Sequence, residues 1–318
     1  MDEFDLIHRY FDRDTGDADV VVGVGDDGAV LCPAAGRHLV SVVDTSVENV
    51  HFPESLPAAD IGFRSVAVNL SDLAAMGSRP RWMLLALTLP KVDADWLSEF
   101  SEGLYAAADE HRVALAGGDT THGGTLVVSV HMIGDVDPQM AMRRDAAMPG
   151  DEVWLTGSTG DAAAGLRLFQ EGSVAGDAAA FLVGRFRRPR ARVAIGQKLA
   201  RFANAAIDVS DGLFADAHKL AQSSSVALSL HLERIPLSPA LCKLFADDAE
   251  VLSLTGGDDY ELLFTAPADS AAEIQRIADA EAVPATRIGQ VSTGIGATCY
   301  RDGNPVSFDD PGYRHFHE

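Results

Sequence analysis

Lysine and cysteine are scarce in this sequence, and their scarcity excludes several classes of protein. The three cysteines, Cys32, Cys242 and Cys299, are odd in number and widely spaced. This argues against a disulfide scaffold or a cysteine-based zinc site and favours a reducing compartment. No lysine follows a glycine-rich loop, which excludes the P-loop kinases. The four lysines are Lys91, Lys198, Lys219 and Lys243.

Long apolar runs and an excess of basic charge are also missing. No apolar run approaches the ~18 residues of a membrane span, and the acidic start lacks the apolar core of a signal peptide. Lys+Arg 25 against Asp+Glu 47 gives a net charge of −22 at pH 7. Nucleic acid and anionic membranes are therefore poor candidates as main partners, because basic surfaces hold phosphates. With 47% hydrophobic residues, we predict a cytoplasmic globular protein.

Apolar spacing in the first half predicts alternating strands and helices. A strand over 38–43 closes on Asp44, and a second strand over 113–116 leads into a glycine pair. Helical periodicity runs over 60–77, with Asp60 as the predicted N-cap, and again over 97–111. Mixed strands and helices continue in the second half, which favours layered α/β domains.

The segment Met148-Pro149-Gly150-Asp151 interrupts this pattern, and we place a domain boundary there. The predicted domains are residues 1–148 and 149–318. We predict an α/β protein (α+β layered) with an N-terminal mixed sheet that carries helices and a C-terminal α/β sandwich.

Aspartates fall at the ends of the predicted strands, usually beside glycine. Each one alone has a structural explanation, since Asp-Gly is common turn chemistry and an Asp before a helix is a cap. Their joint occurrence indicates more, because α/β proteins gather ligands at strand ends. Asp72 lies within a predicted helix and shares with Asn69 a face away from the apolar stripe. The strand-end residues are Asp26, Asp27, Asp44, Asp119, Asp208, Asp211, Asp258 and Asp259.

If these loops converge, their carboxylates need cations. Two carboxylates ~4 Å apart repel by about 4 kcal/mol at an effective dielectric constant of roughly 20. Hard oxygen ligands select Mg²⁺, Mn²⁺ or Ca²⁺ over zinc, and Mg²⁺ is typically shared with substrate phosphates. An acidic pocket that holds several Mg²⁺ ions is therefore a reasonable nucleotide site.

One glycine pattern suggests a different cofactor. The segment Gly23–Gly28 matches G-x-G-x-x-G after a predicted strand, and Asp44 follows near the place of a ribose-binding acid. Two aspartates in the loop disfavour a pyrophosphate, however, and Pro33 and Gly36 break the helix that a dinucleotide fold needs. The residues therefore argue against NAD binding.

Seven motifs occur in an order that is typical of one known family. They are Gly23-x-Gly25-Asp26-Asp27, Asp44 with His51-Phe52, Asn69–Gly77, Gly117-Gly118-Asp119-Thr120-Thr121, Asp208–Leu213, Gly256–Leu262 and Gly312–Phe316. Together they resemble the thiamine-phosphate kinase family of the aminoimidazole-ribonucleotide-synthetase-like superfamily, over nearly the whole chain. The resemblance implies ATP-dependent phosphorylation of thiamine phosphate to thiamine diphosphate by a cytoplasmic homodimer that pairs through its N-terminal domain.

The resemblance also implies roles for individual residues. Several Mg²⁺ ions would be held by Asp27, Asp44, Asp72, Asp119, Asp208 and Asp211. ATP would contact Gly118, Asp119, Arg144 and Ser210. Thiamine phosphate would contact His51, Asp258 and Tyr313. Direct in-line transfer needs positioning and charge neutralisation and no covalent nucleophile, and the acceptor phosphate is already ionised, so no strong general base is expected.

Two departures from the family pattern and several rival functions stay open. Val42-Val43 precede Asp44 where Ser-Thr is frequent, and Asp258 stands in the place of a glutamate. Rivals are another enzyme of the superfamily, a catalytically inactive relative, and an acidic protein that binds divalent cations without catalysis. The region up to Val20 lacks the reactive cysteine of selenophosphate synthetases, and the chain lacks the terminal cysteine of the hydrogenase-maturation relative.

Overall fold

The computed structural model describes residues 3–13 and 16–306, and it divides the chain into two units. The N-terminal unit comprises Met1–Leu73 and Ser78–Gln139, and the C-terminal unit comprises Ala74–Gly77 and Met140–Glu318. Both combine a mixed sheet with helices, as predicted from the sequence. Within the described ranges, no helix is long and apolar enough to cross a membrane.

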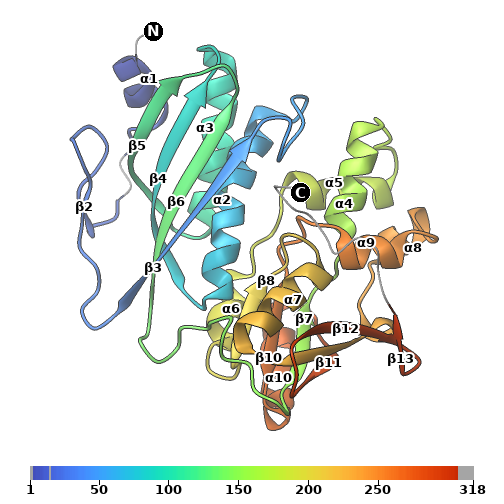
Figure 1. Ribbon diagram of the computed structural model, residues 1–318. Helices are drawn as coiled ribbons and strands as arrows, with labels where there is room; N and C mark the ends of the chain where they lie inside the picture. The colour runs from blue at the N-terminus through green and yellow to red at the C-terminus, as the bar shows by residue number, and fades with distance from the viewer. Residues whose placement is uncertain (1–2, 14–15, 307–318) are drawn as a thin grey trace. The chain divides into compact units, whose positions relative to one another are not determined.

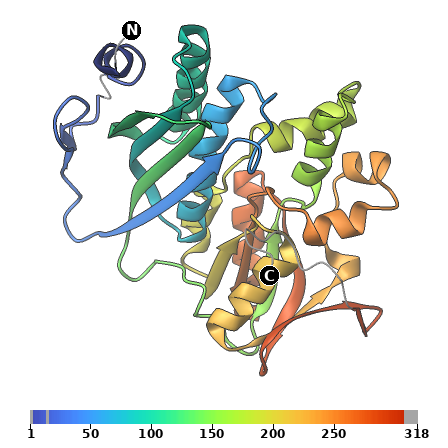
Figure 2. The ribbon, with the colours of Figure 1, turned by 45° about the horizontal axis from the view of Figure 1, so that its top comes forward.

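A four-stranded sheet in the order β3-β6-β4-β5 forms the centre of the N-terminal unit. Strands β4 and β5 run parallel, and the other neighbours are antiparallel. Helices α2 and α3 cover one face of this sheet (Figure 1, Figure 2). The bounds are α1 (Glu3–Tyr10), β1 (Val20–Val22), β2 (Val30–Leu31), β3 (His38–Val47), α2 (Ala58–Ala75), β4 (Arg79–Leu89), α3 (Ala94–Glu110), β5 (Ala114–His122) and β6 (Val127–Val136).

The two predicted helices of this unit form because their apolar residues follow helical spacing. In α3 the buried stripe includes Leu97, Phe100 and Leu104, and the Asp93 carboxylate caps the helix by accepting from the Trp96 N–H. Helix α2 is buried on nearly every side. Its predicted N-cap is wrong: Asp60 lies in the first turn of a helix that begins earlier, at Ala58, and is 2% exposed.

The opposite face of the sheet is covered only in part. The hairpin of β1 and β2 packs Leu31 against the cluster that includes Trp82 and Ala114. On edge strand β3, side chains alternate between the faces, and Val43 is 63% exposed. This unit therefore leaves an open sheet face that carries exposed apolar and hydroxyl side chains.

Arginine also supplies the structural counter-charge in this unit. The Asp135 carboxylate is 1% exposed and accepts hydrogen bonds from Arg37, Arg79 and Arg81. Burial acts to raise the pKa of Asp135, but the bonds from the guanidinium groups outweigh it, and the pKa is lowered. A fully paired carboxylate of this kind serves the fold.

The C-terminal unit contains a seven-stranded sheet in the order β13-β12-β9-β11-β7-β10-β8. Strands β9 and β12 are parallel, and the other neighbours are antiparallel. The strands are β7 (Glu152–Thr156), β8 (Ala205–Asp208), β9 (Ala227–His231), β10 (Leu262–Ala266), β11 (Ala285–Ser292), β12 (Gly296–Arg301) and β13 (Asn304–Val306). The helices are α4 (Asp161–Gln170), α5 (Asp177–Arg187), α6 (Val193–Leu199), α7 (Leu213–Ser224), α8 (Pro239–Leu244), α9 (Ala249–Thr255) and α10 (Ala271–Glu281).

The core of the C-terminal unit joins α7 to this sheet. Leu213 and Leu220 of α7 pack in one buried cluster with Ile207 of β8 and Leu263 of β10. The cluster fixes the start of α7 next to the end of β8. All three cysteines of the chain are free thiols.

Candidate functional site

A cavity of about 470 Å³ lies in the N-terminal unit, beside α1, the loop after β1 and strand β5. One part of its wall is apolar and comes from Phe4, Ile7, Phe11, Val24, Leu85 and Leu115. The other part is polar and acidic and comes from Gly25, Asp26, Asp27, Gly117, Gly118, Asp119 and Thr120. The structure thus brings the predicted residues Asp27, Gly118 and Asp119 to one cavity.

The acidic wall depends on glycine and on a short loop. Gly25 has φ +107°, which lets the chain turn after β1, and the Asp26 carboxylate accepts the Asp27 N–H at 2.8 Å. A Cβ at Gly118 would lie 1.9 Å from the Leu85 carbonyl oxygen, so only glycine fits there. Neither Asp27 nor Asp119 pairs with a cationic side chain in the described part of the chain.

Two aspartates were expected at strand ends, and that placement is wrong. Strand β5 continues to His122 and pairs Asp119 with Ala86 of β4. Strand β3 continues to Val47 and pairs Asp44 with Val130 of β6. Ladder pairing along β4 and β6 holds these acidic residues in strands despite their low strand propensity.

Asn69 links the middle of β3 to α2. Its carboxamide oxygen accepts the Asp44 N–H at 3.2 Å, and its nitrogen donates to the Ser65 carbonyl at 3.0 Å. Asn69 is fully buried, and its side chain is satisfied by these two bonds, one to β3 and one within α2. Asp72 follows one turn later on the same side of α2 and is half-buried.

His51 closes the turn that follows β3. The imidazole Nδ1 accepts the Val47 N–H at 3.0 Å, and the backbone N–H of His51 donates to the Val47 carbonyl at 2.9 Å. Because Nδ1 acts as an acceptor, Nε2 carries the proton of the neutral ring. The half-buried imidazole is therefore held in place by the backbone of the turn.

In the C-terminal unit, Asp208 ends strand β8 as predicted and is 3% exposed. Ser210 and Asp211 follow in the turn before α7, and Gly212 makes that turn with φ +115°. The Asp216 carboxylate, buried in α7, accepts the N–H groups of Ser210 at 3.0 Å and Asp211 at 2.9 Å. Burial raises the pKa of Asp216 to about 6.

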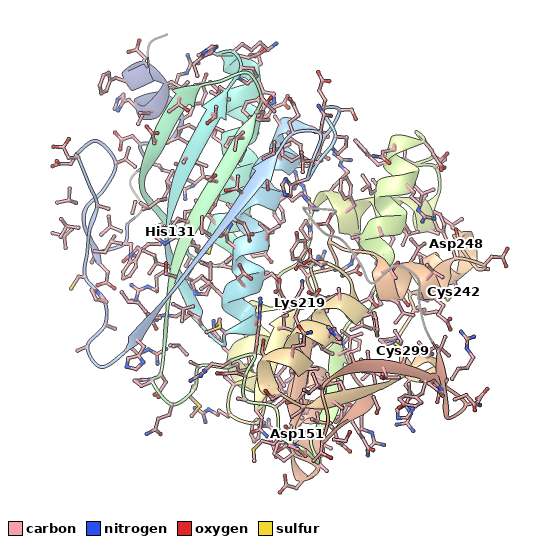
Figure 3. The ribbon with its side chains drawn as sticks, viewed as in Figure 1. His131, Asp151, Lys219, Cys242, Asp248 and Cys299 are labelled. Carbon is pink, nitrogen blue, oxygen red and sulfur yellow. The ribbon has the colours of Figure 1, made fainter. Side chains whose placement is uncertain are left out.

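A lysine that the sequence reasoning did not single out joins this turn. The Lys219 ammonium donates to Asp216 Oδ1 at 2.7 Å and to Asp211 Oδ2. Figure 3 labels Lys219 on α7. The sequence did hold a signal, because positions 216 and 219 are one helical turn apart in a predicted helix.

The glycine-rich segment 256–262 packs against the same turn. The Asp258 N–H donates to the Ser210 carbonyl and the Tyr260 N–H to the Val209 carbonyl, both at 2.8 Å. Asp258 and Tyr260 have φ of 72° and 53°, and the Tyr260 hydroxyl donates to the Asp258 carboxylate at 2.9 Å. The structure therefore brings Ser210 and Asp258 together.

The other two acids of this segment are structural. Both carboxylate oxygens of Asp259 accept N–H groups at the start of α4, from Gly160 at 2.6 Å and Ala162 at 3.1 Å. Burial raises the pKa of Asp259 to about 8. Glu261 is fully buried and bonds to Arg185 and Arg192. Asp258 is the member of this segment whose carboxylate is left partly exposed.

Arg144 and Tyr313 are the remaining predicted site residues. Arg144 is exposed, and only its carbonyl is engaged, by the Ser224 hydroxyl at 2.7 Å. Tyr313 lies outside the described residues. In addition, residues 3–13 and 16–306 contain no group of three or more His, Cys, Asp or Glu side chains close enough to hold a metal ion.

Comparison with protein-family models finds two matches. Residues 25–136 match the N-terminal domain of AIR synthase related proteins, and residues 148–299 match the C-terminal domain of the same proteins. The thiamine-monophosphate kinase of Salmonella typhimurium is 41% identical over 320 residues, which cover 99% of this chain and 98% of the relative.

Solved structures give the same result. The crystal structure of thiamine-monophosphate kinase from Stenotrophomonas maltophilia has a TM-score of 0.88 and 45% identity, over 96% of this chain and 98% of that chain. A structure of AaThiL in complex with AMPPCP and TMP has a TM-score of 0.80 and 31% identity, over 98% of this chain and 96% of that chain. The resemblance drawn from the seven motifs is thereby confirmed at full length.

Proposed function

The chain belongs to the thiamine-monophosphate kinase family, and we propose that it transfers the γ-phosphoryl group of ATP directly to thiamine phosphate, giving thiamine diphosphate. The acceptor is a phosphate oxygen that is ionised at neutral pH, so the reaction needs alignment and charge neutralisation. No described cysteine, serine or lysine has to form a covalent intermediate under this proposal.

The cavity of the N-terminal unit is the observation that carries the proposal. Its apolar wall, with Phe4 and Phe11 of α1, suits a purine base, and its acidic wall suits phosphates that arrive with Mg²⁺. Gly118 allows close approach of a ligand to the backbone of β5. A relative with 31% identity was solved in complex with AMPPCP and TMP, which supports a nucleotide as the ligand.

The chemistry of the acids fits Mg²⁺. Asp27 and Asp119 supply hard carboxylate oxygens at one cavity and lack a cationic partner among the described residues. Asp211 differs, because the Lys219 ammonium already neutralises it. Bound Mg²⁺ would neutralise phosphate charge during the transfer. We propose that Mg²⁺ is held by Asp27, Asp44, Asp72, Asp119, Asp208 and Asp211.

We assign the remaining predicted residues to the two substrates. Ser210 and the exposed Arg144 contact ATP together with Gly118 and Asp119. His51, held by the turn after β3, contacts thiamine phosphate, and the carboxylate of the partly exposed Asp258 complements the thiazolium cation. Tyr313 is proposed as a third contact to thiamine phosphate.

The function is tested with the purified full chain, ATP, Mg²⁺ and thiamine phosphate, followed by phosphorus NMR. We expect thiamine diphosphate to form from thiamine phosphate, not from free thiamine, and to disappear when a chelator removes the metal. ATP binding without product would point to another acceptor. Absence of both would leave an acidic cation-binding protein as the better description.

We also propose that the open face of the N-terminal sheet pairs with a second copy of the chain. Val43 lies midway along the edge strand β3, is 63% exposed, and is flanked on that strand by the exposed Ser41 and Thr45. In analytical ultracentrifugation the wild type should sediment as a dimer and Val43→Asp as a monomer, because the substitution would bury a charge in the interface. Val92→Asp, at a 54% exposed loop valine, should leave the dimer intact. A wild-type monomer at all concentrations would refute the pairing.

A further inference from the structure

We propose that Lys219 and Asp216 form a positioning pair that holds Ser210 and Asp211 in the conformation that receives the nucleotide. The inference rests on the proposed function, in which Ser210 contacts ATP and Asp211 binds a metal ion. Neither Lys219 nor Asp216 needs to touch the substrate. Both act through the turn that carries Ser210 and Asp211.

The turn before α7 has no cap from its own residues. The helix starts after Gly212, which has no side chain to accept the backbone N–H groups that point out of the turn. Asp216, located one turn inside the helix, reaches back and accepts the N–H groups of both Ser210 and Asp211. Because Asp216 is 1% exposed, water has little access to replace these bonds.

Asp216 needs a counter-ion to keep this position. The buried carboxylate lies near the negative charge of Asp208 and, through the shared ammonium, near Asp211. Lys219 is the cation that bonds to it, at 2.7 Å and one helical turn away. Removing one partner of a buried ion pair leaves an uncompensated charge, which here would favour opening of the turn.

The same ammonium also sets the direction of the Asp211 carboxylate. Lys219 donates to Asp211 Oδ2 while its bond to Asp216 anchors it to α7. Lys219 and Asp211 are partly exposed, at 41% and 32% of their side chains, so the Asp211 bond can exchange for a metal ion while the buried Asp216 bond persists. Lys219 thus presents Asp211 at a fixed place before a ligand arrives.

The test compares nucleotide binding by Lys219→Met, Lys219→Arg and Lys198→Met in the full chain. The probe is a non-hydrolysable ATP analogue with Mg²⁺, measured by calorimetry. Lys219→Met should weaken binding by at least about 10-fold, and Lys219→Arg, which keeps the charge, should restore it to within about threefold. Lys198→Met, which removes an exposed ion pair with Glu281, should bind like the wild type.

Steady-state kinetics separate positioning from mere stabilisation. Lys219→Met should raise KM for ATP by about 10-fold but KM for thiamine phosphate by less than about threefold. If Lys219→Met fails to fold, Lys219→Gln replaces it. Wild-type affinity for the analogue in a folded variant, whatever its melting temperature, would overturn the inference. A wild type that binds the analogue but makes no thiamine diphosphate would refute the proposed function and leave this comparison valid.

Discussion

Asp27→Asn and Asp119→Asn should each lower kcat by at least about 100-fold while the protein stays folded. Both carboxylates line the acidic wall of the cavity, and neither balances a cationic side chain within the described ranges. An amide of the same shape therefore removes little structural energy but takes away the negative charge that a divalent cation needs. The measurement is kcat at saturating ATP and thiamine phosphate over a range of Mg²⁺, with a melting curve for each variant.

Asp26→Asn is the matched control for these variants. Asp26 lines the same cavity, but its carboxylate accepts the Asp27 N–H at 2.8 Å, a bond that an amide oxygen also makes. We expect kcat to change by less than about threefold. An equal loss in all three variants would show that the loop acts only through its total charge. Near-normal turnover of Asp119→Asn would remove Asp119 from the metal ligands.

Local sequence patterns were sufficient to predict the helices and strands whose apolar residues repeat with a single clear period. Helix α3 was predicted over 97–111 and spans Ala94–Glu110, because its apolar stripe and acidic N-terminus both depend on neighbours in sequence. Asp208 was predicted at a strand end and lies there, because the short apolar run 205–207 leads into Asp208 and is followed by turn residues.

The positions of Asp44 and Asp119 could not be predicted in this way. Glycine and aspartate are poor strand formers, so the strands appeared to stop before them. In the fold, β3 and β5 are extended by pairing with β6 and β4, which are distant in sequence. Gly118 pairs with Leu85 of β4, and position 118 needs glycine there because the Leu85 carbonyl leaves no room for a Cβ. Such a requirement is visible only after the strands are paired.

The long-range contacts that assemble the candidate site also could not be predicted from the sequence. Asp258 approaches Ser210 through a backbone hydrogen bond between segments that are almost fifty residues apart in sequence. Phe4 and Phe11 reach the cavity because Phe11 packs edge-on against Phe100 of α3, at 6.4 Å between ring centroids. Neither contact has a periodic signal.

The many acids of this chain divide by their partners. Asp135 and Glu261 are buried and bound by guanidinium groups, so their charge is compensated within the fold. Asp27 and Asp119 lack such partners among the described residues and face a cavity. The net charge of −22 therefore mixes structural acids with acids that are available to metal ions, and substitutions should separate the two groups.

Glu261→Gln should lower the free energy of unfolding by about 4 kcal/mol. The Glu261 carboxylate is fully buried and bonds to Arg185 at 2.9 Å, to Arg192 Nε at 2.6 Å and to the Thr156 hydroxyl at 2.7 Å. The amide would leave two largely buried guanidinium groups without their counter-charge and would place an NH₂ against a donor. Urea unfolding, followed by circular dichroism, measures the change.

Glu250→Gln is the control, because Glu250 pairs with Arg301 in a bond whose side chains are 39% and 52% exposed. Solvent screens such a pair, so its loss should cost no more than about 1 kcal/mol. Comparable losses in both variants would mean that burial does not distinguish the two carboxylates.

Since Glu261 lies three residues after Asp258, Glu261→Gln should also raise KM for thiamine phosphate. That effect would show that the buried ion pairs, although remote from chemistry, fix the segment that contacts the substrate.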